Sequence, residues 1–199
     1  MAADRRLVVA SQNQGKCREI GRLLGAFEVL SLADFAPVDF PEEGGDYRRN
    51  ACEKALAAAR ATGLPCVADD SGLEVECLDG APGPYSARFG GAELDDRGRV
   101  DHLLEVLRDQ PEPRRARFYC VAACALPDGR TEVAEGICEG EILMQPRGEG
   151  GFGYDPVFRP SGDARTLAEH STEEKEAISH RGRAFRTLAS KLEELLASQ

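Results

Sequence analysis

The stretch LVVASQNQGKCREIGRLLGAFEVLSL, residues 7–32, carries the pattern that decides the fold class. Its apolar start predicts a short buried strand at 7–10, which runs into a polar turn at 11–16. Apolar residues at helical spacing then predict a helix over 17–27, and residues 27–32 predict a second strand. A strand, a polar loop, a helix and a strand in this order indicate a layered α/β protein.

The remaining chain continues this alternation. Helices are predicted at 50–61, 95–108 and 183–197, with a short acidic helix or turn at 169–178. Strands are predicted at 66–68, 115–126 and 131–143, the last two joined by a tight turn. Because no repeat or linker interrupts the pattern, we predict one domain over residues 1–199 with two lobes.

The charge balance disfavours two classes of partner. With 25 basic and 35 acidic residues the chain has a formal net charge of −10, whereas broad binding to nucleic acid or anionic membrane requires a basic surface. The longest apolar stretch, residues 119–126, is too short to span a bilayer, and the apolar run before Ser11 is too short for a signal peptide. We therefore expect no nucleic-acid partner and no membrane partner.

The seven cysteines match no metal or disulfide pattern. Their number is odd, no two have the two-residue gap of zinc or thioredoxin-like motifs, and only three histidines accompany them. We expect buried, reduced thiols and a cytoplasmic location.

The polar turn SQNQGK, residues 11–16, is the first candidate site. A helix start presents backbone N–H groups and a positive dipole end, both of which favour phosphate, and Lys16 adds a positive charge. The turn is not a P-loop, because it lacks the upstream glycine and the following Ser or Thr of that motif. The alternative is an ordinary capped helix start with a solvated lysine.

The second candidate site is DDSG, residues 69–72, which follows the strand predicted at 66–68. Two adjacent carboxylates are costly to hold together unless a cation or a proton compensates them. Strand alternation directs them to opposite faces, so we expect one of them to enter a given cleft. A phosphate-bound magnesium ion takes one or two protein carboxylates, and Glu42 or Glu43 in the acidic loop could supply the second. The alternative is a solvated acidic turn.

Two further motifs carry aromatic and basic side chains. In GGFGYDP, residues 150–156, glycines around Phe152 and Tyr154 favour an exposed stacking platform for a flat ligand, and Asp155 could accept hydrogen bonds from its edge. In EEKEAISHRGR, residues 173–183, the side chains at the start of the last helix could bind oxo groups or phosphates. The alternatives are a tight turn with core aromatics and a capped, salt-bridged helix start.

Five stretches together resemble the inosine triphosphate pyrophosphatase family. They are ASQNQGK (10–16), ADDSGLEV (68–75), GAPGPYSARF (80–89), GGFGYDPVF (150–158) and EEKEAISHRGRAF (173–185), in the family's order. That family hydrolyses non-standard purine nucleoside triphosphates to the monophosphate and pyrophosphate. The resemblance therefore implies ITP, dITP and XTP as substrates.

The resemblance also implies a fold and a set of site residues. The fold is α/β, a mixed central twisted sheet flanked by helices, with two lobes and a substrate cleft between them; members need Mg²⁺ and are commonly homodimers. Asp70 matches the catalytic carboxylate and metal ligand, and Glu42 matches a metal ligand, with Glu43 left open as the alternative. The substrate-binding residues that it implies are Ser11, Gln12, Asn13, Gln14, Gly15, Lys16, Ser71, Phe152, Gly153, Tyr154, Asp155, Lys175, His180 and Arg181.

In this resemblance the loop 11–16 holds the triphosphate, residues 152–155 stack on and border the base, and Arg181 or the His180 backbone reads the oxo group. Two other functions remain open. A Maf-like nucleotide pyrophosphatase usually has arginine where Lys16 stands and lacks the Ser-His-Arg segment. A catalytically silent nucleotide sensor would not need to retain Asp70 and Lys16.

Overall fold

The structure is a computed structural model that describes residues 5–197. Its strands are β1 (Arg6–Val9), β2 (Glu28–Ser31), β3 (Cys66–Val75), β4 (Arg115–Ala125), β5 (Thr131–Ile142) and β6 (Phe158–Pro160). Its α-helices are α1 (Gln14–Leu23), α2 (Tyr47–Thr62), α3 (Asp96–Val106), α4 (Thr172–Ile178) and α5 (His180–Ala197). None of the helices within residues 5–197 has the length and apolar content needed to cross a membrane.

The strands form one sheet in the order β2-β1-β3-β4-β5-β6. Strand β1 pairs in parallel with β2 and with β3, whereas β5 and β6 are antiparallel. The predicted mixed sheet with flanking helices is therefore confirmed. The sequence did not predict β6, because a strand of three residues is too short to leave a recognisable alternation.

The chain divides into two compact units. Of the described residues, unit 1 holds those up to 70, 120–136 and those from 181 onwards, and unit 2 holds 71–119 and 137–180. Strands β3, β4 and β5 contribute residues to both units. The single domain over residues 1–199 and its two lobes with a substrate cleft stay predictions.

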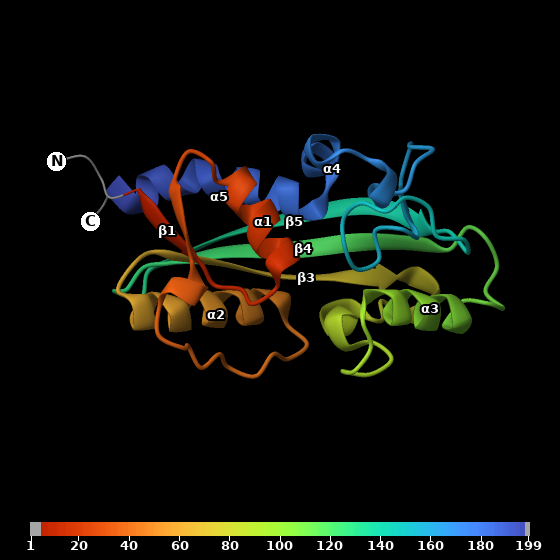
Figure 1. The fold of residues 1–199 in the computed structure, drawn as a ribbon, viewed down its shortest axis with the longest axis horizontal. Helices are drawn as coiled ribbons and strands as arrows, with labels where there is room; N and C mark the ends of the chain where they lie inside the picture. Colours follow the sequence, from red (N-terminus) through yellow and green to blue (C-terminus); the bar gives the residue numbers. More distant parts are fainter. Residues whose placement is uncertain (1–4, 198–199) are drawn as a thin grey trace. The chain divides into compact units, whose positions relative to one another are not determined.

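In unit 1 helices cover both faces of the sheet. Figure 1 shows α1 and α5 on one face and α2 on the other. Ile20 of α1 and Phe185 of α5 are fully buried and belong to one core cluster with Val67 of β3. On α2, Ala51 and Ala55 are fully buried, which lets this alanine-rich helix pack closely. Unit 2 has a core of its own, built on α3, β3, β4 and β6.

Strand β3 is longer than the sequence predicted, and this changes the setting of the acidic pair. It has ten residues instead of the predicted 66–68, so Asp69 and Asp70 lie within the strand and not in a turn after it. The neighbouring strand β1 ends at Val9, which pairs with Val67. Both aspartates therefore lie past the end of β1, where loops and helix starts can approach β3 from either face.

Candidate active site

Asp69 is the centre of a buried charge network in unit 1. Its Oδ2 accepts hydrogen bonds from Arg181 Nη2 at 3.1 Å and Nε at 3.3 Å, and lies 3.1 Å from Lys16 Nζ. Arg181 Nη1 also donates to Glu19 Oε2 at 2.6 Å. Burial alone would raise the pKa of the Asp69 carboxyl, but the charges of Lys16 and Arg181 lower it far below its usual range. Asp69 therefore stays ionised and anchors both cations.

Asp70 is bound by a different helix, as strand alternation requires. Its Oδ2 accepts a 2.7 Å hydrogen bond from Asn50 Nδ2, and its Oδ1 lies 3.8 Å from Lys54 Nζ, both on α2. Burial raises the pKa of the Asp70 carboxyl, although Lys54 and Asn50 oppose the shift. A buried carboxylate with a raised pKa is a better proton acceptor than an exposed one.

Glu43 belongs to the same group, while Glu42 is exposed. Glu43 Oε1 accepts a 2.5 Å hydrogen bond from Lys54 Nζ, and its charge adds to the raised pKa of Asp70. The geometry thus favours Glu43 over Glu42 as the second acid beside Asp70. Sequence spacing left this choice open, because the two glutamates are adjacent in a loop without regular structure.

Lys54 is a site residue that the sequence analysis missed. Burial disfavours its charge, but Asp69 and Asp70 outweigh this and raise the pKa of its ammonium group. The available signal was a lone lysine in an alanine-rich helix, since a buried charge needs a partner.

The predicted phosphate loop, residues 11–16, caps helix α1 and also borders a hollow. Asn13 Oδ1 accepts the Lys16 backbone N–H at 3.0 Å and so caps α1, and Ser11 Oγ accepts the Asn13 N–H at 3.2 Å. The Asn13 side chain therefore serves the helix cap, as the alternative interpretation held, and Gly15 lies in the first turn of α1. A hollow of about 720 Å³ is lined by the 31–38 segment together with Ser11, Gln12, Gln14, Cys17 and Arg18. Lys16, bound to Asp69, is the cation that this loop supplies to the acidic pair.

The surroundings of Arg181 differ from the expectation that it reads a base. Helix α5 begins at His180, three residues earlier than predicted, which puts Arg181 in its first turn. The side chain is 2% exposed, and each guanidinium nitrogen donates to a carboxylate of Asp69 or Glu19. Three of the five guanidinium N–H groups thus bind acids, which favours an anchoring role for Arg181 over donation to an oxo group.

In unit 2, three predicted base-end residues are brought together. Lys175 Nζ donates a 2.5 Å hydrogen bond to Asp155 Oδ2 and lies 4.8 Å from the centre of the Phe152 ring. The Phe152 backbone N–H donates to the same Asp155 oxygen at 2.8 Å. Gly151 has a φ of +72°, and a Cβ there would collide with the Asp155 carboxylate, so this turn requires glycine.

The other predicted residues of unit 2 have structural contacts. The Tyr154 hydroxyl donates to the Ser86 carbonyl at 3.0 Å, and burial raises the pKa of this phenol, so Tyr154 is a core residue and not a stacking platform. The His180 ring stacks on Phe118 at 4.6 Å and is 4% exposed. Ser71 and Gly153, the two remaining predicted residues of unit 2, are half-buried.

Metal-ligating groups are sparse in the described part of the chain. Across residues 5–197, no three or more His, Cys, Asp or Glu side chains are grouped to hold a metal ion. Asp70 and Glu43 nevertheless share the Lys54 ammonium as a cationic partner. Because a magnesium ion that arrives with phosphate ligands needs one or two carboxylates, this oxygen pair fits such a cation.

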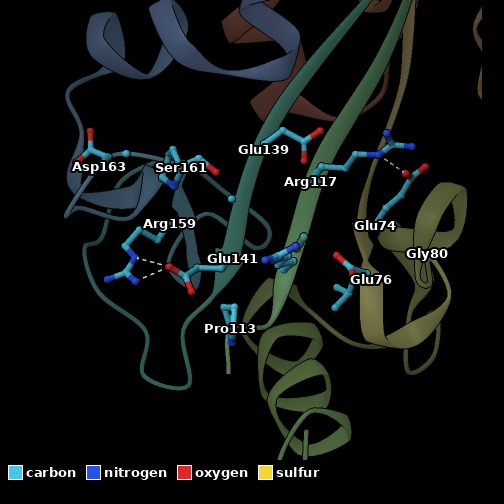
Figure 2. Close-up of a pocket in the computed structure, with 16 residues that line it drawn as sticks. Glu74, Glu76, Gly80, Pro113, Arg117, Glu139, Glu141, Arg159, Ser161 and Asp163 are labelled. Carbon is cyan, nitrogen blue, oxygen red and sulfur yellow. Dashed lines mark hydrogen bonds and ion pairs between the residues drawn. The ribbon is translucent and has the colours of Figure 1, made fainter. Parts of the chain in front are cut away.

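A hollow of about 730 Å³ lies on the sheet of unit 2 (Figure 2). Its wall includes ion pairs between neighbouring strands, with Arg117 Nε 2.7 Å from Glu74 Oε2 and Arg159 Nε 3.0 Å from Glu141 Oε1. No predicted site residue lines this hollow.

Comparisons with known proteins agree over nearly the whole chain. A model of the Ham1 family matches residues 7–191. A dITP/XTP pyrophosphatase of Deinococcus deserti is 54% identical over 185 residues, which cover 92% of this chain and 88% of the relative. A dITP/XTP pyrophosphatase of Streptomyces avermitilis is 51% identical, with coverage of 96% and 98%.

Solved structures give the same result. A HAM1 protein from Coxiella burnetii superposes with a TM-score of 0.84 at 41% identity and covers 95% of this chain and 98% of its own. The Ham1 protein of Staphylococcus aureus superposes with a TM-score of 0.84 at 40% identity, with coverage of 96% and 99%.

Proposed function

Because the chain belongs to the Ham1 family, we propose that it is a nucleoside triphosphate pyrophosphatase that hydrolyses non-standard purine nucleoside triphosphates to the monophosphate and pyrophosphate. The names of its relatives support dITP and XTP as substrates, and ITP shares their oxo group at position 6. One observation in unit 1 carries the proposal. Lys16 and Lys54, from helices on opposite faces of the sheet, both approach the aspartate pair of β3.

Lys16 is the proposed ligand of the departing phosphates. Asp69 holds its ammonium group next to the first turn of α1, whose N–H groups also favour anions. When the bond from the α-phosphorus to its bridging oxygen breaks, these donors stabilise the charge that develops on pyrophosphate. Such fixed charges supply most of what phosphoryl transfer needs.

Asp70 is the proposed acceptor of the proton from the attacking water. Its raised pKa favours proton uptake, and the hydrogen bond from Asn50 fixes its direction. Asp70 and Glu43 are also the residues that would hold Mg²⁺, which when bound neutralises phosphate oxygens and promotes ionisation of water.

Base recognition is assigned to unit 2. Phe152 offers a partly exposed ring for stacking, and the Lys175 ammonium is the proposed donor to the oxo group at position 6. A purine with an amino group there would place a second donor against the Lys175 ammonium, and a site built on hydrogen bonds can discriminate by about 10⁴ or more.

The test is a panel of nucleoside triphosphates with Mg²⁺, scored for pyrophosphate against phosphate. We expect pyrophosphate from ITP, dITP and XTP, and little turnover of ATP. Asp70→Asn should lower kcat by about 10² to 10⁴ with little change in KM, because it removes the proton acceptor and keeps the shape. Asp128→Asn, at an exposed aspartate, is the control. Phosphate as the sole product would refute the cleavage point, and binding of ITP without turnover would support the sensor.

We also propose that the protein is a cytoplasmic homodimer. All seven cysteines are thiols and not disulfides, which suits a reducing compartment. The proposed interface is the face of unit 2 in Figure 2, where the side chains form columns of alternating charge in the strand order β3-β4-β5-β6. The columns consist of Glu74 on β3, Arg115 and Arg117 on β4, Glu139 and Glu141 on β5, and Arg159 on β6.

Two copies of this face have complementary charges when a two-fold axis relates them in one particular orientation. A two-fold axis parallel to the strands, between β4 and β5, puts β3 opposite β6 and β4 opposite β5, so each acidic column meets a basic one. Arg117→Glu should therefore shift the protein towards the monomer in light scattering, and Arg130→Glu, in unit 1, should not. A dimer that Arg117→Glu and Arg159→Glu leave intact has its interface elsewhere.

A further inference from the structure

Asn50 makes three side-chain hydrogen bonds that link the acidic loop to Asp70. It lies in α2 and is 3% exposed. The Gly44 N–H donates to Asn50 Oδ1 at 2.9 Å, and Asn50 Nδ2 donates to the Gly44 carbonyl at 2.8 Å and to Asp70 Oδ2 at 2.7 Å. We propose that Asn50 is a positioning residue, which fixes Glu43 and Asp70 relative to each other. The proposal rests on the function proposed above.

The chemistry of the amide makes this role specific. Its two N–H groups donate to two different acceptors while its oxygen accepts the Gly44 N–H, so every polar group of the side chain has a partner. The reverse orientation would put the amide oxygen against the Asp70 carboxylate, which needs a donor. Helix capping does not explain these bonds, because Asp46 is the N-cap and accepts the Arg49 N–H at 3.0 Å.

Asn50 and Lys54 act as a pair on one face of α2, since residues four apart in a helix are neighbours. Lys54 Nζ bonds Glu43 and lies 3.8 Å from Asp70 Oδ1, while Asn50 bonds Gly44 and Asp70. The contacts thus close a ring from Asp70 through Asn50, Gly44, Glu43 and Lys54 back to Asp70. In this ring Lys54 compensates the negative charges, whereas the uncharged Asn50 fixes the orientation of the Asp70 carboxylate.

The consequence concerns the geometry that a divalent cation requires. Magnesium demands nearly ideal octahedral geometry, so a loop that carries Glu43 without this clamp would place its carboxylate poorly. Loss of a residue that orients metal ligands typically costs 10- to 100-fold in metal affinity or activity. The same range is expected here, with little change in substrate affinity, because the three side-chain hydrogen bonds of Asn50 go to Gly44 and Asp70 and not to the loop that carries Lys16.

The experiment compares Asn50→Ala and the uncharged, near-isosteric Asn50→Leu with wild type. Mn²⁺ binding is followed by electron paramagnetic resonance without nucleotide, and kcat and KM are measured with ITP. Both variants should bind Mn²⁺ about 10- to 100-fold more weakly and lose kcat by at least as much, with KM within a few-fold. Arg49→Ala, a neighbour whose side chain is 71% exposed, should match wild type in both measurements.

A double-mutant cycle separates positioning from plain stability. If Asn50 works through the Glu43 loop, then Asn50→Ala combined with Glu43→Gln should lose little more Mn²⁺ affinity than the worse single variant. Additive losses, or Asn50 variants that keep Mn²⁺ affinity and kcat within two-fold of wild type, would overturn the proposal. Should Asn50→Ala fail to fold, Asn50→Leu, which keeps the side-chain volume and removes the same hydrogen bonds, gives the comparison instead. A wild type that does not hydrolyse ITP refutes the proposed function instead.

Discussion

Replacing Arg181 by methionine tests whether this arginine holds the buried network together or reads the base. Methionine keeps much of the side-chain volume but leaves the carboxylates of Asp69 and Glu19 with one cation fewer. These residues are 2% and 7% exposed, so water cannot compensate for the loss. Removing one partner of a buried ion pair costs about 3–5 kcal/mol in the free energy of unfolding. At about 2–4 °C per kcal/mol for a chain of this size, the Tm should fall by roughly 10 °C.

The assays are urea unfolding followed by circular dichroism and the ratio of kcat/KM for ITP against ATP. Arg130→Met is the matched control, because Arg130 is also paired with an aspartate, at 2.8 Å, but is 39% exposed. That surface pair should contribute less than about 1 kcal/mol. Adding Glu19→Gln to Arg181→Met should recover part of the lost stability, since it removes one uncompensated charge. If Arg181→Met unfolds like the control and instead changes the ITP to ATP ratio, the guanidinium reads the base and the structural argument is wrong.

Two further predictions concern the stacking ring and the buried thiols. Phe152→Ala removes about 1–3 kcal/mol of stacking energy, so it should raise the KM for ITP by about 5- to 150-fold and affect kcat less. An unaltered KM would remove Phe152 from the base site. Burial raises the pKa of the Cys66 thiol to about 11, so its protonated form stabilises the fold. This contribution is complete below a pH near 9 and is lost as the pH rises through about 11. The urea midpoint should therefore decrease as the pH is raised from about 8 to about 10.5. The decrease should be smaller in Cys66→Ser, because the serine hydroxyl does not ionise in this range.

Local sequence predicted the order of strands and helices well, because periodicity records which side of each element faces the core. The strand at 7–10, the turn that follows it and the first helix all occur near their expected places. The opposite orientation of Asp69 and Asp70 also follows from strand alternation alone. The strand end expected at residue 68 was wrong, because aspartate, serine and glycine are rare in strands, whereas here tertiary pairing extends β3 through them.

The motifs by themselves determined which residues are chemically equipped for a polyanion and a purine, and their order identified the family. Only the tertiary structure decided how the charges pair. Arg181 meets Asp69 across 112 residues, and Asn50 meets Asp70 across 20, distances over which sequence spacing carries no geometric information. The physical reason is that a buried charge takes the partner that the fold brings within hydrogen-bond reach. Two adjacent aspartates of one strand therefore take different partners, according to the helices that face them.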